Sequence, residues 1–433
     1  MKKTLLAQAL CAAFLTAAIA APAHAGEAEL LQKIEKLAAE LDAIKAELAA
    51  NRQKTASVEQ KQDVLATTVA NNSVVASATQ QGGPKTVISS YGEINYTKPK
   101  NASNQAEADV GRAVLGITHR FDEKTKMVAE FEWEHAIASV GDQGETEVEQ
   151  LYVEHELSNG LRVKGGLFLM PVGLLNTNHE PTAYFGVHRN FVETAIIPST
   201  WREAGFGLSG SHENGISWDA GITTGFDLTK WDASASEGTE SPLASIHQEG
   251  QLAKSRDLSL HAALNWRGIP GLLLGGSVFS GKAGHASTDF VANDARISLW
   301  DLHARYTPGN WDLSALYARG SISHTEALNL TFPGSPTPVP SSFNGWYLQG
   351  AYKLWSNTDY SLSPFIRYEQ FNTAASYSAM PPGLGVAALE AEKVTTIGAS
   401  FRIGEGVVLK ADLQKFKRDS NLDRFNLGVG YSF

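Results

Sequence analysis

The chain has 433 residues, 43% of them hydrophobic and 19% charged, and its 46 acidic residues outnumber the 36 basic ones. The resulting net charge of −10 argues against nucleic acid as a partner. A single cysteine, Cys11, excludes a disulfide framework and a cysteine metal site.

Residues 1–25 have the pattern of a secretory signal peptide. Lys2 and Lys3 precede an apolar stretch, which ends in an A-x-A cleavage site at Ala25. The apolar stretch is too short for a membrane anchor. Cleavage would leave 34 basic residues against 46 acidic ones, a net charge of −12, and would remove Cys11.

Residues 26–70 predict a periplasmic coiled coil, and the polar residues 71–85 predict a linker. Within 30–69 the apolar residues alternate steps of three and four, which is the a/d pattern of a heptad. The first of these positions are Ile34, Leu37, Leu41, Ile44 and Leu48. We expect this segment to associate with other copies, although a single amphipathic helix lying on its own barrel is an open alternative.

From Thr86 onward the hydrophobic period changes to two, which predicts β-strands. Sixteen strands are expected, at about 86–98, 110–121, 125–137, 146–157, 160–171, 202–212, 215–226, 255–267, 272–283, 294–307, 310–321, 343–355, 360–372, 393–403, 407–416 and 422–433. The turn after every even strand is tight. Most connections after odd strands are longer, above all 172–201, 227–254, 322–342 and 373–392.

Short turns at one end and long loops at the other are typical of an outer-membrane barrel. The two faces of the last strand fit the same interpretation. One face is apolar and the other carries polar or small residues; the apolar face has Phe425, Leu427, Val429, Tyr431 and Phe433. A sheet in lipid must close to pair its backbone. We therefore predict an all-β fold over 86–433, a 16-stranded antiparallel transmembrane β-barrel with an N-terminal α-helical coiled coil. A secreted soluble β protein is the alternative.

Side-chain alternation also predicts the charged residues of the inner wall. The expected wall residues are Arg112, Arg120, Glu130, Glu132, Glu134, Arg162 and Lys164. Rows of opposite charge across a wet pore would orient solutes, or they would neutralise each other.

The connection 172–201 is half apolar, which is unusual for a surface loop. A barrel of sixteen strands leaves an aqueous channel unless something narrows it, and in trimeric porins the loop at this position folds inward. We expect the apolar residues Tyr184, Phe185, Phe191, Ile196, Ile197 and Trp201 to lie against the wall. The expected pore-constriction residues are His179, Glu180, His188, Arg189, Glu193 and Arg202.

The segment "GLFLMPVGLLNTNHEPTAYFGVHRNFVETAIIPSTWREAGFGLSG", residues 166–210, resembles the phosphate-selective porin O and P family. The layout is most similar to dicarboxylate-type porins with an N-terminal coiled coil, and a weaker resemblance extends from Tyr91 to Phe433. The resemblance implies a homotrimeric passive channel in a Gram-negative outer membrane. Phosphate-selective members use arginine ladders and lysine clusters, whereas 172–201 holds one arginine and no lysine. Only the architecture is carried over.

Two motifs are set aside, and we expect neither a cofactor nor a metal. "GFGLSG", at 205–210, lies inside a predicted strand, whereas a dinucleotide fingerprint must open a helix. His179, Glu180 and His188 lack the HExxH spacing, and Pro181 would break a helix that aligned them.

The sequence thus predicts a porin, not an enzyme, for passive diffusion of small hydrophilic solutes, with anions as one candidate class. Expected partners are other copies of the chain, outer-membrane lipid and the solutes, with the cell wall as a further candidate through the coiled coil. One alternative is a structural anchor that acts through the coiled coil. The other is a barrel enzyme, which would need a nucleophile and a base within hydrogen-bond reach.

Overall fold

The computed structural model describes residues 85–158, 160–379, 381 and 387–433. The predicted signal peptide, the predicted coiled coil and all but the last residue of the predicted linker lie outside the described residues. No helix in the described ranges is long and apolar enough to cross a membrane.

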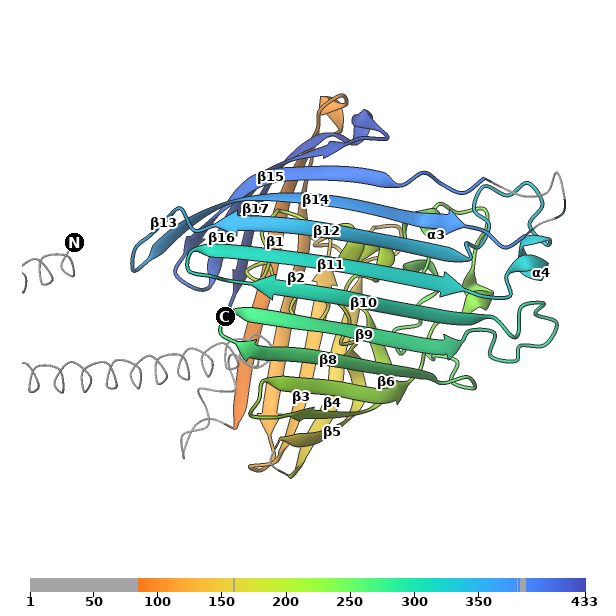
Figure 1. Ribbon diagram of the computed structural model, residues 1–433, viewed down its shortest axis with the longest axis horizontal. Coiled ribbons are helices and arrows are strands. Elements are labelled where there is room, and N and C mark those ends of the chain that lie inside the picture. Colours follow the sequence, from red (N-terminus) through yellow and green to blue (C-terminus); the bar gives the residue numbers. More distant parts are fainter. Residues whose placement is uncertain (1–84, 159, 380, 382–386) are drawn as a thin grey trace, which may run out of the picture. The chain divides into compact units, whose positions relative to one another are not determined.

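The described strands form one antiparallel sheet that closes on itself (Figure 1). They are β1 (Thr86–Pro99), β2 (Glu107–Arg120), β3 (Thr125–Glu134), β4 (Thr146–Ser158), β5 (Leu161–Leu169), β6 (Arg202–Ser211), β7 (Ile216–Thr223), β8 (Ser259–Ile269), β9 (Leu272–Lys282), β10 (Arg296–Tyr306), β11 (Trp311–Ile322), β12 (Ser342–Tyr352), β13 (Trp355–Ser356), β14 (Tyr360–Ser376), β15 (Glu392–Ile403), β16 (Val407–Phe416) and β17 (Arg424–Ser432). β12 pairs directly with β14, and β13 adds only two residues beside it. Pairing of β1 with β17 closes the ring, so the predicted 16-stranded antiparallel barrel is confirmed.

The two faces of the strands differ as the pleat requires. In β17, Asn426 is fully buried, whereas Leu427 is 43% exposed and Val429 is 48% exposed. The same alternation holds in β8, where Leu260 is exposed and His261 is buried. The outward apolar row suits lipid, and the inward row faces the interior of the barrel, which we call the lumen.

The two ends of the barrel carry different connections. The turn end has tight connections, such as 307–310 between β10 and β11 and 404–406 between β15 and β16. Gly309 and Gly404 adopt a positive φ in these turns, which side chains with a Cβ rarely tolerate. The loop end has the long connections, of which 170–201 and 224–258 are the longest.

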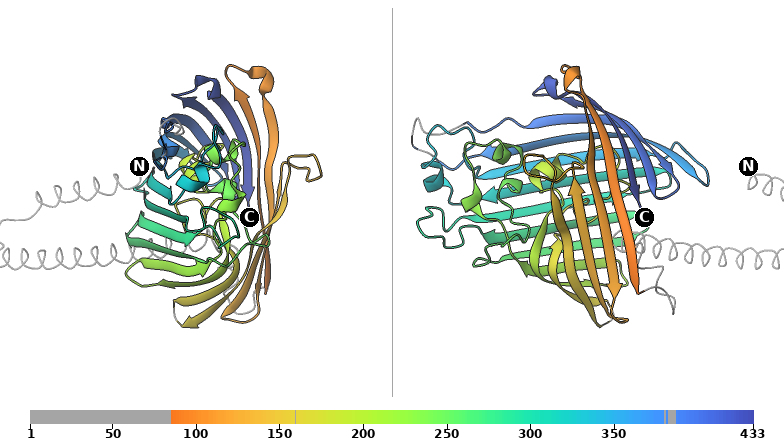
Figure 2. Two further views of the ribbon diagram at one scale, coloured as in Figure 1. Left: turned by 90° about the vertical axis from the view of Figure 1, so that its right-hand side faces the viewer. Right: turned by 180° about the vertical axis from the view of Figure 1, so that it is seen from behind.

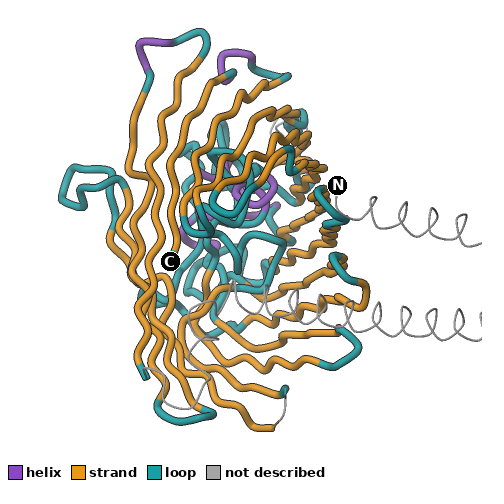
Figure 3. Tube along the Cα trace, turned by 90° about the vertical axis from the view of Figure 1, so that its left-hand side faces the viewer, coloured by secondary structure: helices purple, strands orange, loops and turns teal. Residues whose placement is uncertain are grey.

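The connections contain only short helical segments within the described ranges. These are η2 (Ser103–Gln105), η3 (Val192–Ile196), η4 (Leu228–Lys230), α3 (Glu237–Glu240), η5 (Ala244–Ile246), α4 (Glu326–Asn329) and η6 (Ser420–Leu422). Views from the two ends show several of these segments and their loops inside the ring of strands (Figure 2, Figure 3). The lumen is therefore partly filled by the chain's own connections.

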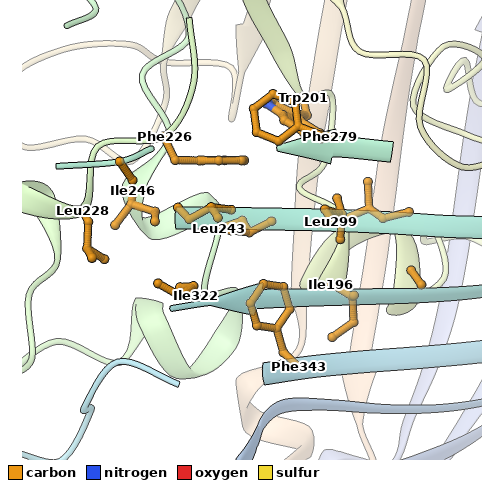
Figure 4. Packing of buried hydrophobic residues seen from close by; sticks show 14 of the residues in the cluster. Ile196, Trp201, Phe226, Leu228, Leu243, Ile246, Phe279, Leu299, Ile322 and Phe343 are labelled. Carbon is orange, nitrogen blue, oxygen red and sulfur yellow. The ribbon is translucent and has the colours of Figure 1, made fainter. Parts of the chain in front are cut away.

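An apolar cluster holds these connections against one side of the lumen (Figure 4). Trp201, from 170–201, stacks on Phe226, from 224–258, with ring centroids 5.1 Å apart. Trp201 also meets Phe279 of β9 edge-on at 4.7 Å. The connection 323–341 adds buried side chains to the same cluster. The barrel thus has an apolar face toward lipid and a second apolar core inside, beside strands β9–β12.

Candidate functional site

Apolar side chains attach the connection 170–201 to the inner wall. Ile196 and Ile197 are fully buried, Trp201 is 1% exposed and Tyr184 is 7% exposed. Phe185 and Phe191 are half-buried. They stack on the wall residues Phe365 and Phe371, with ring centroids 5.9 Å and 5.1 Å apart. Burial of this apolar surface explains why so long a loop stays in the lumen.

Glu193 holds the loop together from within. One carboxylate oxygen accepts hydrogen bonds from the backbone N–H groups of Leu174 and Leu175, at 2.6 and 2.7 Å. The other accepts from the Asn190 amide at 2.8 Å and from the Tyr347 hydroxyl of β12 at 3.0 Å. Burial raises the pKa of Glu193, and these hydrogen bonds oppose the rise. The side chain therefore links two parts of the loop to each other and to the wall through hydrogen bonds.

His179 forms a second attachment of the loop to the wall. Its Nε2 lies 2.7 Å from the Tyr91 hydroxyl and 2.5 Å from a Glu149 oxygen. The guanidinium of Arg112 donates to the His179 carbonyl at 2.5 Å. All of these groups are buried, so strands β1, β2 and β4 all contact this one loop position.

Carboxylates of the wall also accept hydrogen bonds from the loop backbone. Asp412 accepts from the N–H of Val187 at 2.6 Å, and Glu369 accepts from the N–H of Phe191 at 2.6 Å. Buried backbone N–H groups need such partners, because an irregular loop cannot pair with itself. The loop is therefore fixed by polar contacts as well as by apolar packing.

Among the described residues, the lumen contains two cavities that are bordered by one shared side chain. The loop-end cavity has a volume of about 500 Å³ and the turn-end cavity about 280 Å³. Tyr184 lines each of them. Its hydroxyl donates to Glu93 at 2.8 Å, and the ammonium of Lys410 lies 3.5 Å from the centre of its ring. Tyr184 is thus the junction of the two cavities.

The loop-end cavity is bordered by charges of both signs. Its carboxylates are Glu93, Glu132, Glu134, Glu145, Glu147 and Glu249. Its guanidiniums are Arg112, Arg189, Arg202 and Arg424. Two of these are ion-paired, Arg112 with Glu93 at 2.9 Å and Arg202 with both Glu147 and Glu249.

Arg189 differs from the paired arginines of this cavity. Its guanidinium donates to the hydroxyls of Ser199 and Thr200, at 2.6 and 2.9 Å. It has no carboxylate within salt-bridge distance among the described residues. The neighbouring His188 is half-buried, and burial, then the nearby Arg424, lowers its pKa. A charged group with neutral partners keeps its attraction for a passing anion.

Cations dominate the turn-end cavity. It is bordered by Arg305, Lys353 and Arg402, with Asp312 as its carboxylate. Arg305 pairs with Asp312 at 2.6 Å. Arg402 donates to the carbonyl of Thr182 in the loop. The loop therefore contributes to both cavities.

The six expected constriction residues occupy three kinds of position. His188, Arg189 and Arg202 border the loop-end cavity. Glu180 is half-buried and borders neither cavity. His179 and Glu193 differ from the expectation, because both are buried in attachments of the loop and neither borders a cavity.

The seven expected wall residues all lie on the inward face of their strands. Arg112, Glu132 and Glu134 border the loop-end cavity. Glu130 accepts from Gln150 of β4. Lys164 pairs with Asp219 at 2.8 Å, and Arg162 lies 4.0 Å from Glu154. Arg120 lies beside Lys126 in the pairing of β2 with β3. Several wall charges therefore neutralise one another in pairs.

Sequence reasoning missed the junction residue and two of the three turn-end cations. Tyr184 was expected only to pack on the wall. Arg402 and Lys353 carried weak signals, since each lies at a strand end, where the alternation of faces is least informative. Arg402 lies two residues after Ser400, which is buried in β15, so the two side chains lie on the same, inward face of the strand.

No known protein-family model matches the chain. An uncharacterized protein of Aquifex aeolicus (strain VF5) is 29% identical over 350 residues, which cover 78% of this chain and 78% of that protein.

Three solved structures resemble the barrel. OmpF of Salmonella typhi, in complex with daunomycin, has a TM-score of 0.56 and 14% sequence identity. The match covers 80% of this chain and 97% of the OmpF chain. The outer membrane channel DcaP of Acinetobacter baumannii has a TM-score of 0.51 and 14% identity, with the same coverage. A loop L8 deletion mutant of OmpT, an outer membrane protein of Vibrio cholerae, has a TM-score of 0.51 and 12% identity, covering 81% of this chain and 100% of its own. These likenesses show that the barrel has the fold of outer-membrane porins.

Proposed function

We propose that this chain is an outer-membrane porin, through which small hydrophilic solutes diffuse passively, and not an enzyme. One observation carries the proposal: inside a closed barrel with an apolar outer face, two polar cavities meet at Tyr184 of an inward-folded loop. The loop 170–201 acts as the constriction, because it occupies lumen that sixteen strands would leave open. Transport needs no energy source in such a pore, only a concentration gradient.

Arg189 and the turn-end cavity favour anions as the solute class. Arg189 lacks a carboxylate partner, and cations outnumber carboxylates in the turn-end cavity. The resemblance of 166–210 to the phosphate-selective porin O and P family supports an anion pathway of this layout. The loop itself contributes one arginine and no lysine, so phosphate is one candidate among small anions.

We further propose that the chain is exported by its signal peptide and works as a homotrimer in the bacterial outer membrane. The heptads of 30–69 would join the copies in the periplasm, because apolar residues at a and d positions favour self-association. Contact of this segment with the cell wall would make the barrel an anchor as well as a channel.

Planar-bilayer recording tests the proposal. Purified wild-type protein should give discrete conductance steps, and deletion of 181–198 should increase each step without unfolding the barrel, as measured by the β-sheet circular dichroism. Wild-type protein that folds but does not conduct would overturn the channel and favour the anchor. An unchanged conductance after the deletion would overturn the constriction.

A further inference from the structure

Charges on the inner wall are sorted along the axis of the barrel. Strand β3 is the simplest case, because its inward residues run from the turn end to the loop end. Lys126 comes first, and Glu130, Glu132 and Glu134 follow toward the loop end. Lys126 pairs with Glu154 of β4 at 3.1 Å, whereas Glu132 and Glu134 border the loop-end cavity.

The two cavities repeat this order. Six carboxylates and four guanidiniums border the loop-end cavity, a formal excess of two negative charges. Three cations and one carboxylate border the turn-end cavity, an excess of two positive charges. Arg120 and Arg162 lie at the turn end of β2 and β5, on other strands of the same wall. Glu154 of β4, which pairs with Lys126 and lies 4.0 Å from Arg162, offsets part of this positive charge.

We propose that the pathway is bipolar along its axis and rectifies ionic current, with the loop-end cavity favouring cations and the turn-end cavity favouring anions. This inference rests on the proposed porin function. Charged walls with little water between them raise the local concentration of ions of the opposite sign. The two cavities lie one after the other along the axis, with Tyr184 as the side chain between them.

The direction of rectification follows from the order of the two charges. When the loop end is electrically positive, cations enter through the acidic cavity and anions enter through the basic one. Both kinds of ion then accumulate at the Tyr184 junction, and conductance is high. When the voltage is reversed, each ion must enter through the cavity that repels it, so the junction is depleted and conductance is low. Salt weakens the effect, since the screening length falls from about 10 Å at 0.1 M to about 3 Å at 1 M.

Single channels of the full chain test the proposal in symmetric KCl. We expect the current ratio at equal and opposite voltages to be roughly two or more in 0.1 M KCl, because wall potentials of several kT change local ion concentrations severalfold. The ratio should approach one in 1 M KCl. Ser199→Cys, modified by a polymeric maleimide too large to cross and added to one chamber, reports which end faces that chamber, because Ser199 lines the loop-end cavity.

Two sets of variants separate the ends. Arg402→Gln with Lys353→Gln should reduce the ratio and shift the reversal potential in a KCl gradient toward cation selectivity. Glu134→Gln with Glu145→Gln should also reduce the ratio but shift the reversal potential toward anions. Lys124→Gln is the matched control, since Lys124 is an exposed cation of a turn-end connection and borders neither cavity.

The outcomes distinguish this inference from the porin function. Wild-type protein without any conductance would overturn the porin function. Conducting channels with a current ratio of one in 0.1 M KCl would overturn only the bipolar pathway. Variants that shift the reversal potential as expected but leave the current ratio unchanged would also overturn it, because charges arranged across the pore set selectivity without any axial order.

Discussion

The hydroxyl of Tyr184 donates a hydrogen bond to Glu93, 2.8 Å away, and so ties the residue at the junction of the two cavities to strand β1. Lys410 of β16 lies against the ring of Tyr184, with its ammonium 3.5 Å from the ring centre. Neighbouring strands of the closed ring, β1 on one side of β17 and β16 on the other, thereby fix a single side chain of the loop.

Replacing Tyr184 with alanine should increase single-channel conductance, because the side chain that separates the two cavities is removed. The increase should be smaller than that from deleting 181–198, since the loop backbone stays in place. Tyr184→Phe is the matched control, which keeps the ring against Lys410 and loses only the bond to Glu93. If the Tyr184→Ala and Tyr184→Phe channels had the same conductance, the ring of Tyr184 would not separate the two cavities.

Glu193→Gln should loosen the loop. The amide would place an N–H group where the carboxylate accepts hydrogen bonds, and a buried donor left without a partner costs about 1–3 kcal/mol. We expect faster proteolysis of 170–201 and noisier open-channel current, with the thermal unfolding of the barrel unchanged.

Thr194→Val is the control for this variant. Thr194 is the next residue, and its hydroxyl makes one bond, to the Asn190 carbonyl at 3.2 Å. Equal proteolysis rates in the two variants would argue against Glu193 as the link between the two parts of the loop.

Acidification should change the pore through His188. Burial and then Arg424 lower the pKa of His188, so the imidazole is neutral at pH 7 and gains charge only below the ordinary value of about 6.5. Selectivity for anions should therefore rise as the pH falls below about 6.5. Because the folded state binds this proton less readily than the unfolded state, docking of the loop should weaken over the same range.

Reversal potentials in a KCl gradient, measured from pH 7 to pH 5, check this prediction. His188→Gln should flatten the profile, and His247→Gln serves for comparison because His247 borders the same cavity beside Glu249. If the reversal potential of the His188→Gln channel changed with pH as it does in the wild type, a group other than His188 would be responsible.

Removal of 30–69 should lower the heat resistance of trimers in detergent while leaving the conductance of each pore unchanged. The heptads would join the copies, whereas the barrel closes through pairing of β1 with β17 alone. Gel mobility after heating at graded temperatures measures the change. Trimers that are equally heat-resistant without the segment would contradict the oligomerising role.

The strands could be predicted from sequence because lipid imposes a period of two on one face and tight turns punctuate it. The expected range 407–416 coincides with β16, and 86–98 differs from β1 by one residue. Outward-facing residues such as Leu427 can be recognised because they are large and apolar. The residues that alternate with them must then face the lumen.

The loop carries no such period, so the destination of each side chain could not be read from it. His179 and Glu193 are polar residues in an irregular segment, and only the folded path shows that Tyr91 and Tyr347 meet them. The part of the apolar cluster that comes from 224–258 and 323–341 was missed for the same reason. Its signal was the large apolar residues of 224–258, such as Phe226 and Trp231, which a solvated loop would not need.

The apolar cluster also sets an order of assembly. Its members range from Phe168 in β5 to Tyr347 in β12, so they meet only after eight consecutive strands are in place. Contacts between such distant residues form late, because the chain between them must first be ordered. We therefore expect a newly inserted barrel to begin as a wide, leaky ring, which narrows when its connections settle inside.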